Sequence, residues 1–313
     1  MVIGVGNRKN QYVDLNVGTH DKVFHCDEVV GVSIIEIANP TCDIYVVRTR
    51  EIDELRKLDI VIDVGGGEYD HHVKGFDLKR ECGVKYASAG LMWKKYGKKA
   101  ITNVMKRENI SALDYEINQV FEKVDQDYII PVDMEDNGEM SSRHMFSFIP
   151  IFLPPWIEED QDFDKEFEQV QNITTKILKK CIKDALVQVI TRADINQRIE
   201  RLWNGILELP DQTVPWLEHV TSYNKKNSNV IKFVIFPYPA GGWAAQCVPP
   251  SIEERFKQLI PFPEKWAGGN DKTLPEISKI EDATFCHNGR FFARAKSKES
   301  IIKMCEIAEK DNN

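Results

Sequence analysis

The chain has 313 residues, a hydrophobic fraction of 42% and a net charge of −8, which is the composition of a soluble globular protein long enough for two domains. The acidic balance, with a pI near 5.5, excludes a protein that coats nucleic acid by bulk electrostatic attraction. The seven cysteines are spread singly without a CxxC pair, which excludes a disulfide framework and indicates a reducing compartment.

We expect neither a membrane span nor a signal peptide from this sequence. No apolar run approaches the ~18 residues of a membrane span, and the apolar part of "MVIGVGNRKNQ" is too short for a signal peptide. We therefore expect a cytoplasmic protein that does not contact a membrane. A nuclear or organellar location stays open, and so does a homo-oligomer.

Strand-like and helix-like patterns alternate in the first third of the chain. The expected elements are a strand at 11–17, a helix at 27–38, a strand at 42–49, a short helix at 51–58, a strand at 59–66 and a helix at 87–101. Strands that alternate with helices in this way predict a parallel sheet, so the expected fold class is α/β.

Helical patterns dominate the middle of the chain, and strand patterns return near its end. We expect a helix opened by a Ser111-x-x-Asp114 capping signal, a long helix at 163–203, strands at 229–238 and 243–248, and a final helix at 297–310. The proline-rich "IPIFLPPW" is a natural boundary. The predicted layout is an α/β domain over 1–150, a helical connection over 151–204 and a smaller α+β domain over 205–313.

The stretch "VGTHDKVFHCDE" gathers two histidines and three carboxylates where the first strand ends. His20 follows that strand, while His25 and Asp27 lie at the turn into the next helix. Active groups of an open parallel sheet collect beyond the carboxyl ends of its strands. Asp63 at the end of the third strand, with Tyr69, Asp70, His71 and His72 after it, should reach the same edge.

These side chains are the imidazole and carboxylate ligands that divalent Mn, Zn, Fe or Mg ions take in proteins. A single such histidine is more often structural, so the clustering of four of the seven histidines at one edge carries the inference. One ion needs three or four protein ligands. The surplus predicts two ions that share a bridging carboxylate, ~3.5–4 Å apart.

Five separated blocks resemble the motifs of the Myg family, named for a melanocyte proliferating gene and related to the DHH phosphoesterases. They are "GTHDKVFHCDE", "DIVIDVGGGEYDHH", "VDMEDNG", "GGWAAQCVP" and "FCHNGRFFARAKSKESIIKMCEIA". The resemblance spans nearly the whole chain. It implies a parallel-sheet DHH-type domain joined by a long helical segment to a smaller α+β domain, a manganese-preferring dinuclear centre, and 3′-to-5′ RNA exonuclease activity.

The resemblance also implies roles for individual residues. It assigns His20, His25 and Asp63 to one ion. The second ion would be held by Asp27, Asp63, His71 and one aspartate of "VDMEDNG", where Asp136 is the first choice and Asp133 the second. Asp70 would orient His71, and His72 would face the substrate phosphate. The ions are expected to be two Mn²⁺, with Mg²⁺ or Zn²⁺ as alternatives.

These parts fit phosphodiester hydrolysis without a serine or cysteine nucleophile. Two divalent ions lower the pKa of a shared water and neutralise charge on phosphoryl oxygens. Cys26 lies between His25 and Asp27, and we expect a small buried residue whose pKa the surrounding carboxylates raise.

A second candidate site lies near the end of the chain. The segment "CHNGRFFARAK" combines basic groups with aromatic rings, which suits a phosphate backbone and unstacked bases. Without the family resemblance, a solvated basic strand over core phenylalanines would be the preferred interpretation. The predicted substrate-binding residues are His287, Asn288, Gly289, Arg290 and Arg294.

Two other functions stay open from the sequence. The same metal edge would support a small-molecule phosphoesterase that cleaves pyrophosphate or short nucleotides, and the acidic pI slightly favours it. The histidines could instead hold structural zinc in a non-catalytic metal- or RNA-binding protein, although structural zinc sites usually rely on cysteine. The expected partner is therefore single-stranded RNA or a short nucleotide.

Overall fold

The computed structural model describes residues 13–139 and 143–312, so Gln11 and Tyr12 of the first predicted strand and the "MVIGVGNRKNQ" segment lie outside the described residues. Contacts divide the chain into two compact units, 1–189 and 190–313. The division falls inside one long helix, within the predicted connection over 151–204. No helix among the described residues is both long and apolar enough to cross a membrane.

The first unit is built on a three-stranded parallel sheet. Its strands are β1 (Val13–Thr19), β2 (Cys42–Arg48) and β3 (Ile60–Val61), in the order β2-β1-β3. Helices α1 (Cys26–Ala38) and α2 (Ile52–Leu55) lie between consecutive strands. The predicted alternation and the parallel sheet are therefore confirmed. The third strand is shorter than predicted, because the backbone turns at Asp63, whose φ is 59°.

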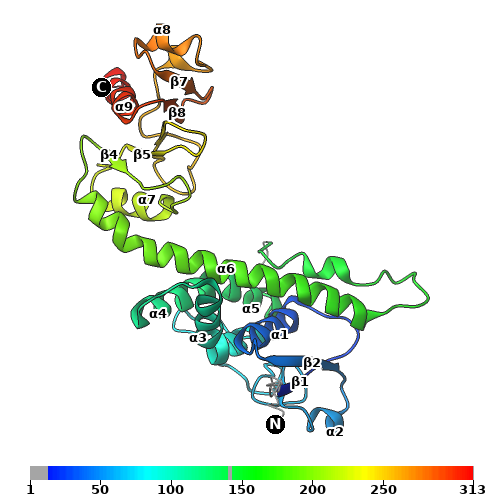
Figure 1. The fold of residues 1–313 in the computed structure, drawn as a ribbon. Helices are drawn as coiled ribbons and strands as arrows, with labels where there is room; N and C mark the ends of the chain where they lie inside the picture. Colours follow the sequence, from blue (N-terminus) through cyan, green and yellow to red (C-terminus); the bar gives the residue numbers. More distant parts are fainter. Residues whose placement is uncertain (1–12, 140–142, 313) are drawn as a thin grey trace, which may run out of the picture. The chain divides into compact units, whose positions relative to one another are not determined.

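Helix α1 is apolar almost all round, because it is covered on both sides. Only Glu36 among its 13 residues is not buried. The core that surrounds α1 joins Val17 and Ile62 of the strand region to residues of the helices α3 (Ser88–Glu108) and α6 (Phe163–Ile199). Figure 1 shows α1 beside β2 in this layered unit.

The middle of the chain is helical, as the sequence predicts. Helix α4 (Asp114–Val124) continues through the π-helical turn η1 (Asp125–Ile129) into α5 (Ile130–Asp136). The predicted Ser111 cap is wrong. The helix begins three residues later, where the Glu116 carboxylate accepts the backbone N–H of Leu113 at 2.7 Å, and this bond satisfies a free amide at the helix start.

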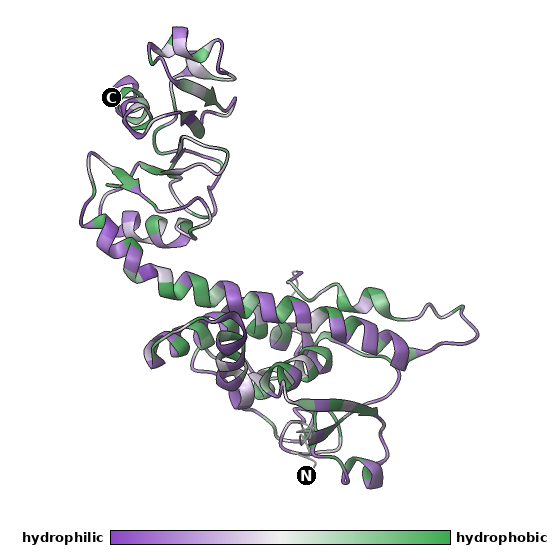
Figure 2. Ribbon diagram, viewed as in Figure 1, coloured by the Kyte–Doolittle hydropathy of each residue, from purple (hydrophilic) through white to green (hydrophobic). Residues whose placement is uncertain are grey.

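Helix α6 spans 37 residues, close to the predicted range of 163–203. Figure 2 shows hydrophobic and hydrophilic residues alternating along it. Its apolar side, from Phe167 to Val189, belongs to the core of the first unit. The 3-10 turn η2 (Ile149–Phe152) joins that core through Ile149, although "IPIFLPPW" had suggested a boundary.

The second unit is α+β, as predicted. Its five strands have the order β4-β5-β6-β8-β7, with β4 and β5 parallel and the other neighbours antiparallel. The strands are β4 (Ile206–Glu208), β5 (Phe233–Pro237), β6 (Trp243–Cys247), β7 (Ala283–Cys286) and β8 (Phe292–Ala295). The helices are α7 (Leu217–Lys226), η3 (Glu264–Trp266), α8 (Leu274–Ser278) and α9 (Lys298–Asp311).

Candidate metal centre

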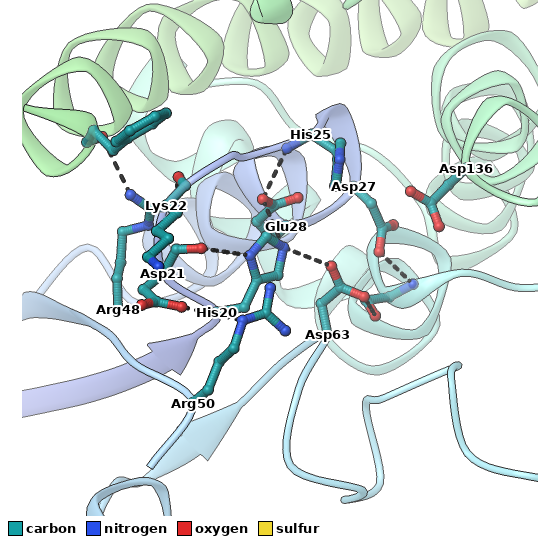
Figure 3. Close-up of polar contacts among 12 residues, drawn as sticks. His20, Asp21, Lys22, His25, Asp27, Glu28, Arg48, Arg50, Asp63 and Asp136 are labelled. Carbon is teal, nitrogen blue, oxygen red and sulfur yellow. Dashed lines mark hydrogen bonds and ion pairs between the residues drawn. The ribbon is translucent and has the colours of Figure 1, made fainter. Parts of the chain in front are cut away.

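The turn between β1 and α1 carries the first group of candidate ligands. His20 follows β1 directly, His25 is the N-cap residue of α1, and Asp27 and Glu28 occupy the first helical turn. The His20 side chain is buried, and its Nε2 lies 3.1 Å from Glu28 Oε1 and 3.4 Å from Asp63 Oδ2. Figure 3 shows His20, Glu28 and Asp63 turned toward one another at this edge of the sheet.

Two arginines at the end of β2 fix this turn. Arg48 donates to the carbonyl oxygen of Lys22 at 2.6 Å, and Arg50 Nε donates to Asp21 Oδ1 at 3.1 Å (Figure 3). The turn that carries His20 and His25 is therefore tied to the neighbouring strand, which limits its conformational freedom.

His71 and His72 extend the cluster on the other side of Asp63. His71 Nε2 lies 2.8 Å from Asp136 Oδ2, and its Nδ1 lies 3.4 Å from Asp63 Oδ1 and 3.1 Å from the Ser88 hydroxyl. His72 Nε2 lies 3.2 Å from the same Asp63 oxygen, but 63% of the His72 side chain is exposed. His72 is therefore the member of this pair that solvent can reach.

Asp63 stands between the two groups of ligands. One of its carboxylate oxygens faces His20 and the other faces His71 and His72. Its backbone adopts the left-handed conformation, which a residue other than glycine rarely adopts without a compensating interaction. Three sets of donor atoms around it are each close enough for an ion, with members within 4.8 Å of one another: His20–His25–Glu28, Asp63–His71–His72 and Asp27–His71–Asp136.

The N-terminus of α3 holds Asp27 in place. The amide of Ser88 donates to one Asp27 oxygen at 2.9 Å, and the amide of Ala89 donates to the other at 2.6 Å. These amides have no partner within the helix, and the helix dipole favours a negative charge there. Asp27 is fully buried, so this bidentate contact sets its orientation toward His71 and Asp136.

Asp133 lies outside the three sets, although it is one turn from Asp136 on α5. Its carboxylate accepts the amide of Gly90 at 2.9 Å and the guanidinium of Arg80 at 2.6 Å. Arg80 also donates to Asp125, so Asp133 belongs to a buried ion-pair network beneath the cluster. Of the two aspartates predicted in "VDMEDNG", the structure brings only Asp136 to the histidines.

The contact at Gly90 leads to a prediction about stability. A Cβ atom at Gly90 would lie 1.9 Å from Asp133 Oδ2, whereas one at Gly67 would meet nothing within 4 Å. We expect Gly90→Ala to lower the free energy of unfolding by about 1–3 kcal/mol, the usual cost of overpacking. Urea unfolding of Gly90→Ala beside the control Gly67→Ala tests this, and equal stability of the two variants would contradict it.

Asp70 contacts the backbone of its own loop and not the His71 ring. Its two oxygens accept the amides of Gly66 at 2.8 Å and His72 at 3.0 Å. The His71 Nδ1 atom lies beside the Ser88 hydroxyl and the Asp63 carboxylate. Asp70 therefore fixes the path of the loop from which His71 and His72 project.

The buried charges of the cluster fit divalent cations. Burial raises the pKa of the Asp27 carboxyl, and the carboxylates of Asp63 and Asp136 raise it further. Burial alone lowers the pKa of His20, but hydrogen bonds to Asp63 and Glu28 raise it to about 10. The cluster therefore draws positive charge toward it. Glu28 Oε2 is buried and has no hydrogen-bond partner among the described residues, which leaves an oxygen free for a cation.

Three residues that lie in or around the cluster could not be identified from the sequence, namely Glu28, Arg80 and Ser88. Glu28 lies in the ligand-rich stretch, but its position three residues after His25 is that of a capping-box glutamate and gives no sign of a role at the centre. Arg80 and Ser88 follow the "DIVIDVGGGEYDHH" block in sequence but belong to none of the five motifs. The "ASAG" start of a predicted helix was the available signal for an amide pair that binds an anion.

A further set of donors adjoins the cluster. Cys26, Glu135 and His144 approach within the same range, and the Cys26 thiol donates to the carbonyl oxygen of Phe146 at 3.3 Å. Burial raises the pKa of the Cys26 thiol, and Glu135 raises it further, so Cys26 stays protonated. This agrees with the prediction of a small buried cysteine.

The predicted substrate-binding residues lie on the β7–β8 hairpin of the second unit. The Arg294 guanidinium stacks over the Tyr238 ring at 4.0 Å, and the rings of His287 and Phe291 are 4.3 Å apart. His287 Nδ1 accepts the amide of Gly289 at 2.9 Å, while Asn288 and Gly289 are exposed in the turn. Arg290 has a φ of 58°. The hairpin thus presents cations beside aromatic rings.

Comparison with known proteins identifies the chain's relatives. The MYG1_exonuc model, described as Uncharacterised protein family (UPF0160), matches residues 16–308. The chain is 27% identical to the MYG1 exonuclease of Mus musculus, over 95% of this chain and 85% of that protein. It is 29% identical to the MYG1 protein of Chlamydia trachomatis, over 94% of each. The structure of RecJ from Thermus thermophilus in complex with Mn²⁺ is 11% identical, with a TM-score of 0.25 over 94% of this chain and 51% of that chain.

Proposed function

The chain belongs to the MYG1 exonuclease family and is a metal-dependent hydrolase, and on that premise we propose that it is a 3′-to-5′ exonuclease that cleaves RNA at a dinuclear centre. The observation that carries the proposal is the convergence of imidazole and carboxylate donors around Asp63, within ion-binding distance of one another. Unpaired cysteines suit a reducing compartment such as the cytoplasm, where we place the enzyme.

Under this proposal the two ions share Asp63, and their other donors differ. His20, His25 and Asp63 would hold the first ion, and Asp27, Asp63, His71 and Asp136 the second, with Asp63 bridging. The two oxygens of Asp63 face different histidines, which supports the bridging role. Two bound Mn²⁺ ions would supply an activated water and neutralise charge on the phosphoryl group. Mg²⁺ or Zn²⁺ would be the alternatives.

The protein's own groups prepare the site for that reaction. The α3 amides fix Asp27, and Asp70 fixes the loop of His71 and His72. His72 is exposed and has one ring nitrogen beside Asp63, so it would contact the phosphate of a bound substrate from the open side. Preorganised polar groups of this kind act on charge that develops in the transition state.

An acidic protein needs local positive charge to hold a polyanion such as RNA. Carboxylates crowd the metal centre, and the net charge is −8. The β7–β8 hairpin offers guanidinium groups and aromatic faces, the two features that bind phosphates and unstacked bases. We therefore assign RNA binding to His287, Asn288, Gly289, Arg290 and Arg294.

Removing the two arginines should weaken RNA binding selectively. Arg290→Asn suits the left-handed backbone better than alanine does, and Arg294→Gln keeps a polar side chain beside Tyr238 while it removes the charge. We expect the double variant to bind an RNA oligomer more weakly, with a salt-dependence slope reduced by about 0.7 for each phosphate that the protein no longer neutralises. Hydrolysis of a small phosphodiester should change little.

The matched control removes the same amount of charge from another surface of the second unit. Lys303 and Lys310 are exposed on α9, and the double variant Lys303→Gln/Lys310→Gln lowers the net charge by the same two units. It should bind the RNA oligomer nearly as the wild-type protein does. Equal weakening by this control would overturn the assignment of RNA binding to the hairpin.

A substrate screen tests the function itself. Metal-free protein supplied with Mn²⁺ should shorten a 5′-labelled RNA oligomer one nucleotide at a time, and it should do so faster than it cleaves DNA, dinucleotides or pyrophosphate. Rapid cleavage of pyrophosphate or dinucleotides alone would instead identify a small-molecule phosphoesterase. Bound metal without cleavage of any substrate would identify a non-catalytic protein.

A further inference from the structure

Glu28 is a fully buried acid of the cluster that the proposed ligand sets leave out. Its exposed fraction is 0%, and it lies in the first turn of α1. Oε1 accepts the amide of His25 at 2.8 Å and lies 3.1 Å from His20 Nε2. Oε2 has no hydrogen-bond partner among the described residues.

Helix capping explains only part of this environment. A glutamate three residues after the N-cap commonly accepts the N-cap amide, and Oε1 does so here. Capping does not require the second oxygen to be buried, and a buried carboxylate without full pairing is costly. The carboxylate of Glu28 belongs to a set of donors that also includes His20 and His25, all within 4.8 Å of one another. Those neighbours are metal-ligand types, which points to a cation.

We propose that Glu28 is a ligand of the first ion, and that His20, His25, Glu28 and the shared Asp63 form a site that is richer in nitrogen than the second one and prefers Mn²⁺ over Mg²⁺. The inference rests on the dinuclear centre of the proposed function and adds a carboxylate to its first ion. Two imidazoles beside the two carboxylates suit transition-metal ions, whereas Mg²⁺ prefers oxygen donors and keeps its water shell.

The second ion has a different environment. Its donors are the carboxylates of Asp27, Asp63 and Asp136 with the single imidazole of His71. Oxygen-rich donors of this kind accept Mg²⁺ as readily as Mn²⁺. The two positions are thus chemically unequal, and a mixture of the two metals should fill them unequally.

Competition between metals tests the inference without reference to activity. Wild-type protein is equilibrated with Mn²⁺ and a hundredfold excess of Mg²⁺, desalted and analysed for both metals. We expect one Mn²⁺ per chain to remain. Glu28→Gln keeps the shape and the capping oxygen but removes the charge, so it should lose this ion, with Mn²⁺ affinity at the site reduced at least about tenfold.

Glu36→Gln is the matched control on the same helix, because the Glu36 carboxylate is bonded to Gln171, Thr175 and Lys179 of α6. It should retain the ion. Wild-type affinity in a folded Glu28→Gln variant would overturn the inference. If circular dichroism shows that this variant is unfolded, the wild-type competition decides, and equal displacement of both Mn²⁺ ions by Mg²⁺ overturns it.

The substrate screen tests the proposed function, whereas these binding measurements test the role of Glu28. Selective Mn²⁺ retention without RNA cleavage would reject the proposed function alone. Cleavage of RNA by a protein whose Glu28→Gln variant binds Mn²⁺ normally would reject the role of Glu28 alone.

Discussion

Asp63→Asn is expected to abolish catalysis and to empty the metal centre, with kcat lowered by at least about 10³-fold. Asparagine tolerates the left-handed backbone at this position, so the fold should survive while the charge between the two ions is lost. Metal content per chain, measured beside kcat, should fall together with it.

Asp133→Asn is the informative comparison for this variant. The Asp133 carboxylate is bonded to Arg80 and Gly90, so its loss should lower the free energy of unfolding while the protein keeps its bound metal. Full metal occupancy and normal turnover in Asp63→Asn would show that the bridging assignment is wrong.

His72→Ala should lower kcat by about 10²-fold or more, whereas metal content stays near the wild-type value. The reason is its exposure: 63% of the side chain is accessible, while the neighbouring His71 is buried between Asp63, Asp136 and Ser88. Under the proposed function, His72 contacts the substrate phosphate from the open side of the centre, with its Nε2 3.2 Å from Asp63 Oδ1.

Lys74→Ala is the control for His72, because Lys74 is exposed in the same loop and carries no metal-ligand type of side chain. It should leave both kcat and metal content unchanged. Loss of metal in His72→Ala would instead make His72 a ligand, and the roles of His71 and His72 would have to be exchanged.

The sequence predicted the parts of the centre that follow from strand ends. His20 and Asp63 stand at the ends of neighbouring parallel strands, and such ends meet at one edge whatever the details of packing. The parallel sheet itself follows from the alternation of strands and helices. These features depend on short-range patterns, so they could be predicted before the structure was known.

The remaining features depend on packing between distant segments. The i, i+3 spacing of Asp133 and Asp136 does not show which of them lies beside the histidines. Asp133 instead binds Arg80, 53 residues earlier in the chain, and the amide of Gly90. The groups that hold Asp27 are backbone amides. Every residue except proline has such an amide, so the residue types do not reveal this contact. Glu28 has the sequence position of a helix cap, and only its complete burial distinguishes it.

Anomalous diffraction from crystals grown with Mn²⁺ tests the dinuclear centre most directly. We expect two manganese peaks about 3.5–4 Å apart, the spacing of two-metal hydrolytic sites, with Asp63 between them. One peak should lie beside His20 and His25 and the other beside His71 and Asp136. A single peak, or none within reach of Asp63, would contradict the account.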